Sequence, residues 1–267
     1  MSKLNAIKTF RDLLAFLTII PVGKTEDFVV TSAEYMCLFP LFGGLIGVLA
    51  AGYFLLSGFI VSGLLSLVNN LFRVPTGFLE NAAPALLTIA FLLVLTGLQH
   101  FDGLVDLGNA IGLNKLEDRR AAAHAWIVTY KGAILAFAVE FAAVAGLFFL
   151  RGDWALRAIV TAEVVAKLSM VTILAVGKPT HKGLGAYFLE KGKRKRNMLA
   201  YAIAILISIP LLGWIGLLIV VVGFLSGVIM DRVAASVFGG VSGDMIGATN
   251  EVSRATTLVL LAGVSLL

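Results

Sequence analysis

Charged residues are scarce in this sequence: Asp, Glu, Lys and Arg make up 14% of its 267 residues, whereas 59% are apolar. Soluble domains carry about 25% charged and roughly 45–50% apolar residues, so this composition excludes a soluble protein. The only cysteine, Cys37, excludes an intramolecular disulfide and a cysteine-based metal site. Basic residues give a net charge of +5, yet we expect no nucleic-acid partner. The composition predicts a polytopic integral membrane protein.

Apolar stretches long enough to cross a bilayer recur along the chain. A helix needs about 20 apolar residues to span a hydrocarbon core of roughly 30 Å. Residues 63–72 either continue the first such stretch or form a surface segment, and Pro210 marks a reversal inside a later run. We expect one all-α membrane-embedded domain, 1–267, with about seven spans near 38–62, 82–101, 132–150, 158–176, 197–212, 214–237 and 244–267.

The first twenty residues predict a helix that lies in the membrane interface. Apolar residues such as Phe10 and Leu14 share one helical face, and polar residues such as Lys8 and Arg11 share the other. A cleaved signal peptide is not expected, because no small-residue cleavage site follows and Asp12 interrupts the pattern. Residues 4–20 are therefore predicted to be an interfacial anchor.

The basic residues predict the orientation of the bundle. Lys and Arg near the ends of membrane helices stay in the cytoplasm. With the N-terminus inside, all of the 21 basic residues fall on the inner side except Arg73, Arg151 and Arg157, which lie outside, and Lys167, which lies within a span. We expect a multi-pass protein of the cell membrane whose N-terminus and active site face the cytoplasm.

The first polar inner segment is 99–109, at the inner end of the second expected span. If the helix continues through it, Asp102 and Asp106 share a face, with Asn109 three residues further. Two carboxylates at this spacing repel each other unless a cation lies between them, and oxygen ligands suit Mg²⁺, with Mn²⁺ as an alternative. A solvated helix end is the other interpretation, but Gly103 favours the close approach of a ligand.

The second polar segment, 239–251, is a glycine-rich turn that leads into a helix. Free backbone N–H groups at such a helix start, near Gly240 and Gly243, suit a phosphate group. Asp244 and Glu251 are seven residues apart on one face of the helix, where they could complete the metal site. The alternative is that the glycines serve close helix packing, and both roles are compatible.

The third segment, 177–188, mixes glycines with basic residues, a composition that suits a phosphate-bearing substrate; these residues are Lys178, His181 and Lys182. The basic cluster at 191–196 is more typical of a topology signal or of contact with anionic lipid. Arg119 and Arg120 either clamp a phosphate or only add to the positive charge of the inner side.

Acids for a divalent ion and glycine-rich basic segments, all at the inner edge of the bundle, favour phosphoryl-type transfer at the membrane surface. A transporter would place its charges nearer the midplane of the bilayer. Glu163 and Lys167, four residues apart within a span, are expected to neutralise each other as a buried pair, whereas Glu140 has no local partner.

Five segments, taken in order, resemble the cobalamin synthase family, that is, the adenosylcobinamide-GDP ribazoletransferases. The resemblance covers nearly the whole chain, and five motifs in register are more specific than any one of them. The segments are 16–22 (FLTIIPV), 39–47 (FPLFGGLIG), 100–106 (HFDGLVD), 183–185 (GLG) and 239–251 (GGVSGDMIGATNE).

The resemblance implies an enzyme that joins adenosylcobinamide-GDP to α-ribazole or its 5′-phosphate and releases GMP, with Mg²⁺, in nucleotide-loop assembly. It implies that Asp102, Asp106 and Asp244 bind the metal. Glu251 would be a further ligand or the base for the attacking hydroxyl, and His100 would orient a phosphate or accept that proton. Substrate-binding residues are expected at Gly103, Asn109, Arg119, Arg120, Lys178, His181, Lys182, Gly240, Gly243 and Asn250.

Three positions depart from the family's pattern. Many members have Asp where this chain has Asn109 and Glu where it has Arg254, and a Met and an Asp are expected where Ala125 and its neighbours lie. These departures leave open the number of metal ions, and whether His124 replaces a missing ligand. A homo-oligomer and docking of other cobamide-pathway enzymes also stay open. The alternatives are a CDP-alcohol phosphotransferase, whose denser aspartate series is absent, and a small-solute or cation transporter.

Overall fold

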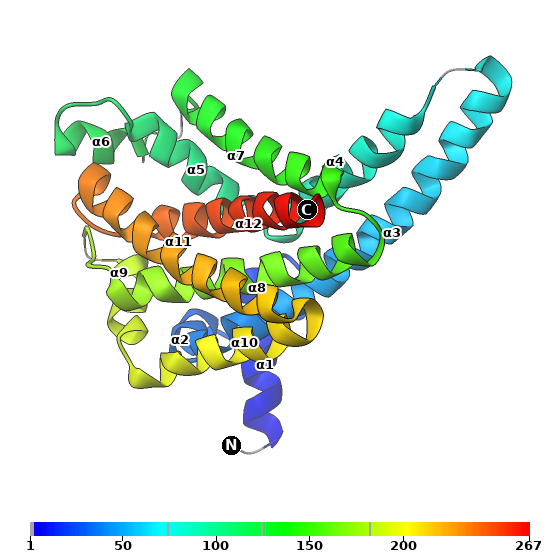
Figure 1. Ribbon diagram of the computed structural model, residues 1–267. Coiled ribbons are helices and arrows are strands. Elements are labelled where there is room, and N and C mark those ends of the chain that lie inside the picture. Colours follow the sequence, from blue (N-terminus) through cyan, green and yellow to red (C-terminus); the bar gives the residue numbers. More distant parts are fainter. Residues whose placement is uncertain (1–2, 74, 124, 126, 182) are drawn as a thin grey trace.

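The computed structural model describes residues 3–73, 75–123, 125, 127–181 and 183–267. This part of the chain contains α-helices and two short 3₁₀ helices, and no β-strand occurs in it (Figure 1). In chain order the elements are α1 (Lys3–Leu17), α2 (Phe28–Glu34), η1 (Met36–Leu38), α3 (Phe39–Phe72), α4 (Gly77–Leu95), α5 (Gln99–Ala110), α6 (Leu116–Ala123), α7 (Tyr130–Phe149), α8 (Gly152–Val176), α9 (Leu184–Gly192), η2 (Lys195–Met198), α10 (Leu199–Leu212), α11 (Trp214–Phe238) and α12 (Gly243–Ser265).

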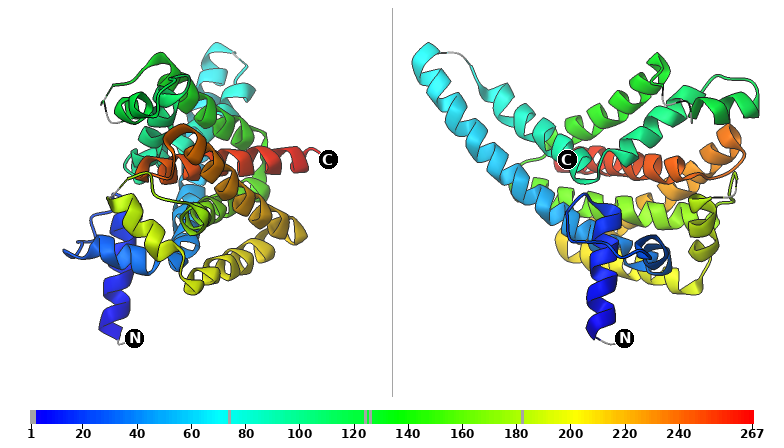
Figure 2. Two further views of the ribbon diagram at one scale, coloured as in Figure 1. Left: turned by 90° about the vertical axis from the view of Figure 1, so that its left-hand side faces the viewer. Right: turned by 180° about the vertical axis from the view of Figure 1, so that it is seen from behind.

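Helices α8 and α12 occupy the centre of the bundle (Figures 1 and 2). Helix α8 packs against α3, α10, α11 and α12, and α12 also packs against α5 and α7. Close glycine contacts explain the tight fit: a Cβ at Gly43 of α3 would clash with the backbone of Glu163, and a Cβ at Gly47 with that of Val160. Small residues let membrane helices approach this closely.

Six described helical segments are long and apolar enough to cross a membrane, which confirms an all-α polytopic bundle. Most of α8 is buried, whereas the other spans expose large apolar side chains such as Phe59 and Phe141 outward, as a lipid-facing surface requires. The seventh expected span corresponds to α12, which has the length but not the apolar composition of the others. The six segments are Met36–Phe72, Gly77–Leu95, Tyr130–Phe149, Gly152–Val176, Lys195–Leu212 and Trp214–Phe238.

The second expected span, 82–101, is wrong at its inner end. Helix α4 stops at Leu95, and the chain turns through Gly97 and Leu98, which have φ angles of 70° and 61°. A left-handed backbone cannot continue a right-handed helix, so Asp102 and Asp106 lie on a separate short helix, α5. Residues 63–72 continue α3, which extends with α4 beyond the rest of the bundle (Figures 1 and 2).

The N-terminal helix α1 runs across the direction of α8 and α12 (Figures 1 and 2). Its first half exposes Phe10, while Leu14 and Leu17 are buried against the bundle. Asp12 is fully buried, and its carboxylate accepts hydrogen bonds from the backbone N and hydroxyl of Thr25. Part of the expected interfacial anchor is therefore integrated into the core.

Candidate active site

The site is built where α5 crosses α12 at two glycines. A Cβ added to Gly103 of α5 would clash with the backbone carbonyl of Asp244 and lie 3.0 Å from the amide nitrogen of Ala248. A Cβ added to Gly247 of α12 would lie 3.0 Å from the Cα of His100. The glycines thus permit the two backbones to meet, and this contact brings Asp102 next to Asp244.

Gly103→Ala is expected to weaken the fold and the site together. The added methyl group forces α5 away from α12, and overpacking of this kind costs about 1–3 kcal/mol. We expect a lower thermal midpoint in detergent and a partial loss of the enzymatic activity proposed below. Gly263→Ala, on the partner helix α12, is the control, because a Cβ there meets nothing within 4 Å. Equal effects of the two variants would contradict this packing.

Two cavities flank the aspartates. The acidic cavity has a volume of about 250 Å³ and is lined by Asp102, Val105, Asp106, Ala123, Ile127, Val128 and Asp244. The aromatic cavity has a volume of about 320 Å³ and is lined by Phe16, Leu17, Phe39, Gln99, His100, Asp102, Met170, Leu174, Phe188, Gly243, Asp244, Ile246 and Gly247. Asp102 and Asp244 line both, so they form the boundary between the cavities.

The aspartates of the acidic cavity repel one another. Burial, together with the nearby charges of Asp244 and Asp102, raises the pKa of Asp106 to about 7. None of the three pairs with a basic side chain in the described part of the chain; Asp244 accepts one hydrogen bond, from the Ser242 hydroxyl at 3.2 Å. Unneutralised carboxylates facing one cavity are a donor set that favours a divalent cation.

The three carboxylates fit a Mg²⁺ ion that is shared with a substrate better than they fit an ion enclosed by protein ligands alone. Within the described residues, no group of three or more His, Cys, Asp or Glu side chains is placed to hold one ion. Mg²⁺ is commonly held by one or two carboxylates together with substrate phosphates and waters. Asp102 and Asp244, with Asp106 beside them, are the residues that would supply those carboxylates.

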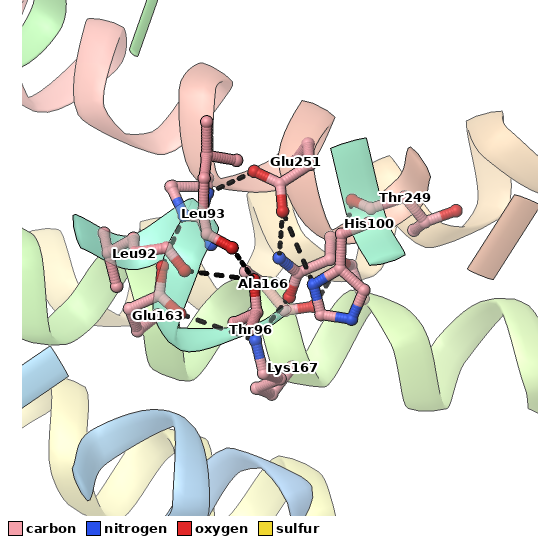
Figure 3. Close-up of polar contacts among 12 residues, drawn as sticks. Leu92, Leu93, Thr96, His100, Glu163, Ala166, Lys167, Thr249 and Glu251 are labelled. Atoms are coloured by element: carbon pink, nitrogen blue, oxygen red, sulfur yellow. Dashed lines mark hydrogen bonds and ion pairs between the residues drawn. The ribbon is translucent and has the colours of Figure 1, made fainter. Parts of the chain in front are cut away.

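Glu251, predicted as a metal ligand or base, lines neither cavity. Its carboxylate accepts hydrogen bonds from the Arg254 guanidinium and from the Asn250 side chain, the latter at 3.0 Å (Figure 3 shows this region). It also lies 3.4 Å from Nδ1 of His100. Glu251 is 1% exposed. Its role as a ligand stays a prediction, and its carboxylate lies beside His100, which lines the aromatic cavity.

A buried charge network extends from Glu251 into α8. Arg254 also donates to Glu163, and Lys167 Nζ lies 3.4 Å from Glu163 and donates to Asn250 at 2.6 Å. The expected Glu163–Lys167 pair is thus confirmed, although it is part of a larger set of two carboxylates and two cations. Ions in a low-dielectric interior are tolerated when they are paired in this way.

Glu140, for which the sequence offered no local partner, is buried in α7 and lines an apolar cavity of about 650 Å³ between α4 and α7. Neither carboxylate oxygen has a hydrogen-bond partner in the described part of the chain.

Backbone pairing joins the second and third polar segments. The amide of Val241 donates to Lys178 O at 2.7 Å, and Thr180 N donates to Val241 O at 3.2 Å. Gly240 is required here because a Cβ would clash with this strand-like pair. Lys178 and His181 are exposed on this loop, and Lys182 lies outside the described residues. The two segments, distant in sequence, therefore form one surface beside the start of α12.

Both predicted phosphate-clamp arginines contact backbone carbonyls at the end of α11. Arg119 donates from Nη1 to Ser236 O at 2.9 Å, and Arg120 donates from Nη2 to Phe238 O at 2.9 Å. Guanidinium groups satisfy the free carbonyls of a helix C-terminus and oppose its negative dipole end. The structure shows this helix-capping role, while substrate binding by either residue stays a prediction.

Asn109 is hydrogen-bonded to the segment 127–129, part of which lines the acidic cavity. Its side chain donates to Ile127 O at 2.7 Å and accepts from the amide and hydroxyl of Thr129 at 3.0 and 2.7 Å. Asn109 is buried and does not line either cavity. An amide has both the donor and the acceptor that these bonds use. The predicted replacement ligand His124 lies outside the described residues.

Part of the basic cluster at 191–196 is neutralised by α2. Glu34 lies 3.2 Å from Lys191, 3.6 Å from Arg196, and forms an ion pair with Arg194. This contact ties α2 to the segment after α9.

No local pattern in the sequence indicated that aromatic residues line the site. Phe16, Phe39 and Phe188 come from three separate helices, and only their meeting in space makes a cavity wall. Phe16 and the 39–47 segment lie in motifs that resemble the family, and this resemblance was the one sign in the sequence that they belong near the site.

The fold and the site define a polytopic helical membrane protein with paired cavities that meet at acidic side chains. Residues 9–262 match the family model described as Cobalamin-5-phosphate synthase, and the chain belongs to this family. It is thus a member of an enzyme family of cobalamin biosynthesis.

Individual relatives carry the same kind of name. The adenosylcobinamide-GDP ribazoletransferase of Methanocella arvoryzae is 28% identical, over 97% of this chain and 97% of that protein. The enzyme of Halorubrum lacusprofundi is 30% identical over 94% and 95%, and that of Pyrococcus abyssi is 31% identical over 74% and 85%. No solved structure matches the chain.

Proposed function

We propose that this protein joins adenosylcobinamide-GDP to α-ribazole or α-ribazole 5′-phosphate and releases GMP, as the names of its relatives indicate. The observation that carries the proposal is the pair of cavities that meet at Asp102 and Asp244. A transferase must hold two substrates at one reaction centre, and this arrangement offers one cavity for each.

We assign the cofactor as Mg²⁺, held by Asp102 and Asp244 with Asp106 beside them. When bound, the ion would neutralise the charge of the diphosphate oxygens. The backbone N–H groups that open α12, at Gly243 and Asp244, are also suited to a phosphate, because the first amides of a helix have no intrahelical partner. A Cβ added to Gly243 would meet nothing within 4 Å.

We propose that His100 accepts the proton of the attacking hydroxyl. It lines the aromatic cavity together with Asp102 and Asp244, whereas Glu251 is enclosed by Arg254 and Asn250. The Glu251 carboxylate lies 3.4 Å from Nδ1 of the imidazole. A positioned base of this kind accelerates proton transfer in the transition state.

The direct test is GMP release by purified protein in lipid. We expect release from adenosylcobinamide-GDP only when α-ribazole 5′-phosphate and Mg²⁺ are both present, and loss of release when EDTA removes the ion. Release without the ribazole compound would indicate a hydrolase. No release by folded, lipid-embedded protein, combined with solute uptake into sealed vesicles, would favour the transporter alternative.

We propose that the end of the bundle with α6, α9 and the start of α12 faces the cytoplasm. This end holds Lys115, Arg119, Arg120, Lys178 and the basic cluster at 191–196, whereas Arg151 lies at the other end of α8. The distribution follows the positive-inside rule. Soluble substrates could then reach the site from the cytoplasm, where other enzymes of the pathway would meet the basic surface.

A further inference from the structure

The aromatic cavity is lined by two chemically different groups of side chains. Phe16 of α1 stacks on Phe188 of α9 with a centroid distance of 5.1 Å and an interplanar angle of 16°. Phe39, at the start of α3, also stacks on Phe16, with a centroid distance of 6.0 Å and an interplanar angle of 27°. The same cavity is also lined by His100 and the boundary aspartates. The aromatic side chains therefore suit a planar apolar ring, and the polar side chains suit hydroxyl or phosphate groups.

We propose that the aromatic cavity binds the heterocyclic base and ribose of the ribazole substrate, and that the acidic cavity receives the diphosphate of the corrinoid substrate. This assignment rests on the proposed function and deepens it. It names the residues Phe16, Phe39 and Phe188 as the site that recognises the base, a role that no motif in the sequence indicates.

Size supports this assignment of the two substrates. A cavity of about 320 Å³ lies at the small end of the range of roughly 300–1,000 Å³ that is usual for pockets holding a single small ligand. A nucleoside fits this class, whereas a corrinoid nucleotide is several times larger and must leave most of its mass outside. Only its diphosphate needs to enter the smaller acidic cavity, which has a volume of about 250 Å³.

Chemistry supports the same assignment. Aromatic side chains recognise planar bases by stacking, independently of the hydrogen-bonding pattern of the base. A base that packs against the aromatic side chains has its attached ribose in the same cavity as His100 and Asp102. The diphosphate in the acidic cavity lies on the other side of the same aspartates. The attacking oxygen and the phosphorus thus approach each other at the boundary.

The bond changes balance in this arrangement. The ribose hydroxyl oxygen forms a bond to the phosphorus that carries the cobinamide, and its proton passes to His100. The bond from this phosphorus to the bridging oxygen breaks, and the oxygen leaves with its electron pair as part of GMP. No oxidant or further co-reactant is needed.

The test separates the two substrates by their KM values. Phe16→Leu removes the ring and is expected to raise KM for α-ribazole 5′-phosphate about 10-fold, because the base loses an aromatic contact. KM for adenosylcobinamide-GDP should stay within about 2-fold of the unmodified protein. Phe16→Tyr keeps the ring and should restore the first KM. Phe59→Leu, at a residue that is 80% exposed on α3, is the matched control.

Calorimetric binding of α-ribazole alone to the full-length protein gives a second readout. We expect the unmodified protein and Phe16→Tyr to bind it, and Phe16→Leu and Phe188→Leu to bind it about 10-fold more weakly. A rise in KM for adenosylcobinamide-GDP instead, or unchanged affinity in folded Leu variants, would overturn the assignment. If the unmodified protein binds α-ribazole at these aromatic side chains but releases no GMP, the proposed reaction fails while the base site stands.

Discussion

Asp244→Asn is expected to reduce GMP release by about 100- to 1,000-fold, the range seen when one group that stabilises transition-state charge is removed. Asp244 lines both cavities and lies against Gly103 where α5 meets α12. Asn keeps the shape of the side chain but loses the negative charge that would hold a cation between the cavities. Asp102→Asn, at the other boundary residue, should have an effect of similar size.

The same substitution should leave the fold intact. Asp244 makes one side-chain hydrogen bond, with Ser242, and its charge contributes to the repulsion around Asp106. Removing a repelling charge does not lower stability, so we expect an unchanged or higher thermal midpoint. Asp153→Asn is the control, because this carboxylate is exposed at the far end of α8. Full GMP release by folded Asp244→Asn protein would remove Asp244 from the site.

Arg254→Met is expected to produce the largest loss of stability, about 3–5 kcal/mol, as when one partner of a buried ion pair is deleted. Arg254 is fully buried and pairs with both Glu163 and Glu251. Its loss leaves two buried carboxylates with a single cation, Lys167. The measurement is the thermal midpoint and the yield of monodisperse protein in detergent.

A charge-balanced variant separates electrostatics from packing. Arg254→Met combined with Glu251→Gln leaves one carboxylate and one cation, and it should recover a substantial part of the lost midpoint. Arg232→Met, at an exposed position of α11, is the matched control and should behave like the unmodified protein. A midpoint for Arg254→Met equal to that of the control would show that the network contributes nothing to stability.

Local patterns in the sequence predicted those parts of the site that lie on one helix. Glu163 and Lys167 are four residues apart on α8, so the helical repeat alone places them in contact. Asp102 and Asp106 share α5 in the same way, even though that helix is not the end of a membrane span. The turn at Gly97 and Leu98 was missed because no Asp, Glu, Lys or Arg interrupts the stretch 82–101.

Partners on different helices were not predictable. Arg254 stood out only as a departure from the family's pattern, yet it forms the centre of the buried network. From the sequence, Arg119 and Arg120 fitted a phosphate clamp and a general positive charge of the inner side equally well. In the structure both residues cap the C-terminus of α11. Charge and spacing do not reveal which backbone a long side chain will reach.

The sequence by itself determined that this protein is a helical membrane bundle, because runs of apolar residues can satisfy their backbone hydrogen bonds in lipid only as helices. It also supplied the acidic and glycine-rich motifs. Only the tertiary structure decided which of these residues share a cavity. The crossing of α5 and α12 brings Asp102 to Asp244, and the docking of α1 and α9 adds Phe16 and Phe188. Helix packing depends on surfaces from distant segments, which no local pattern contains.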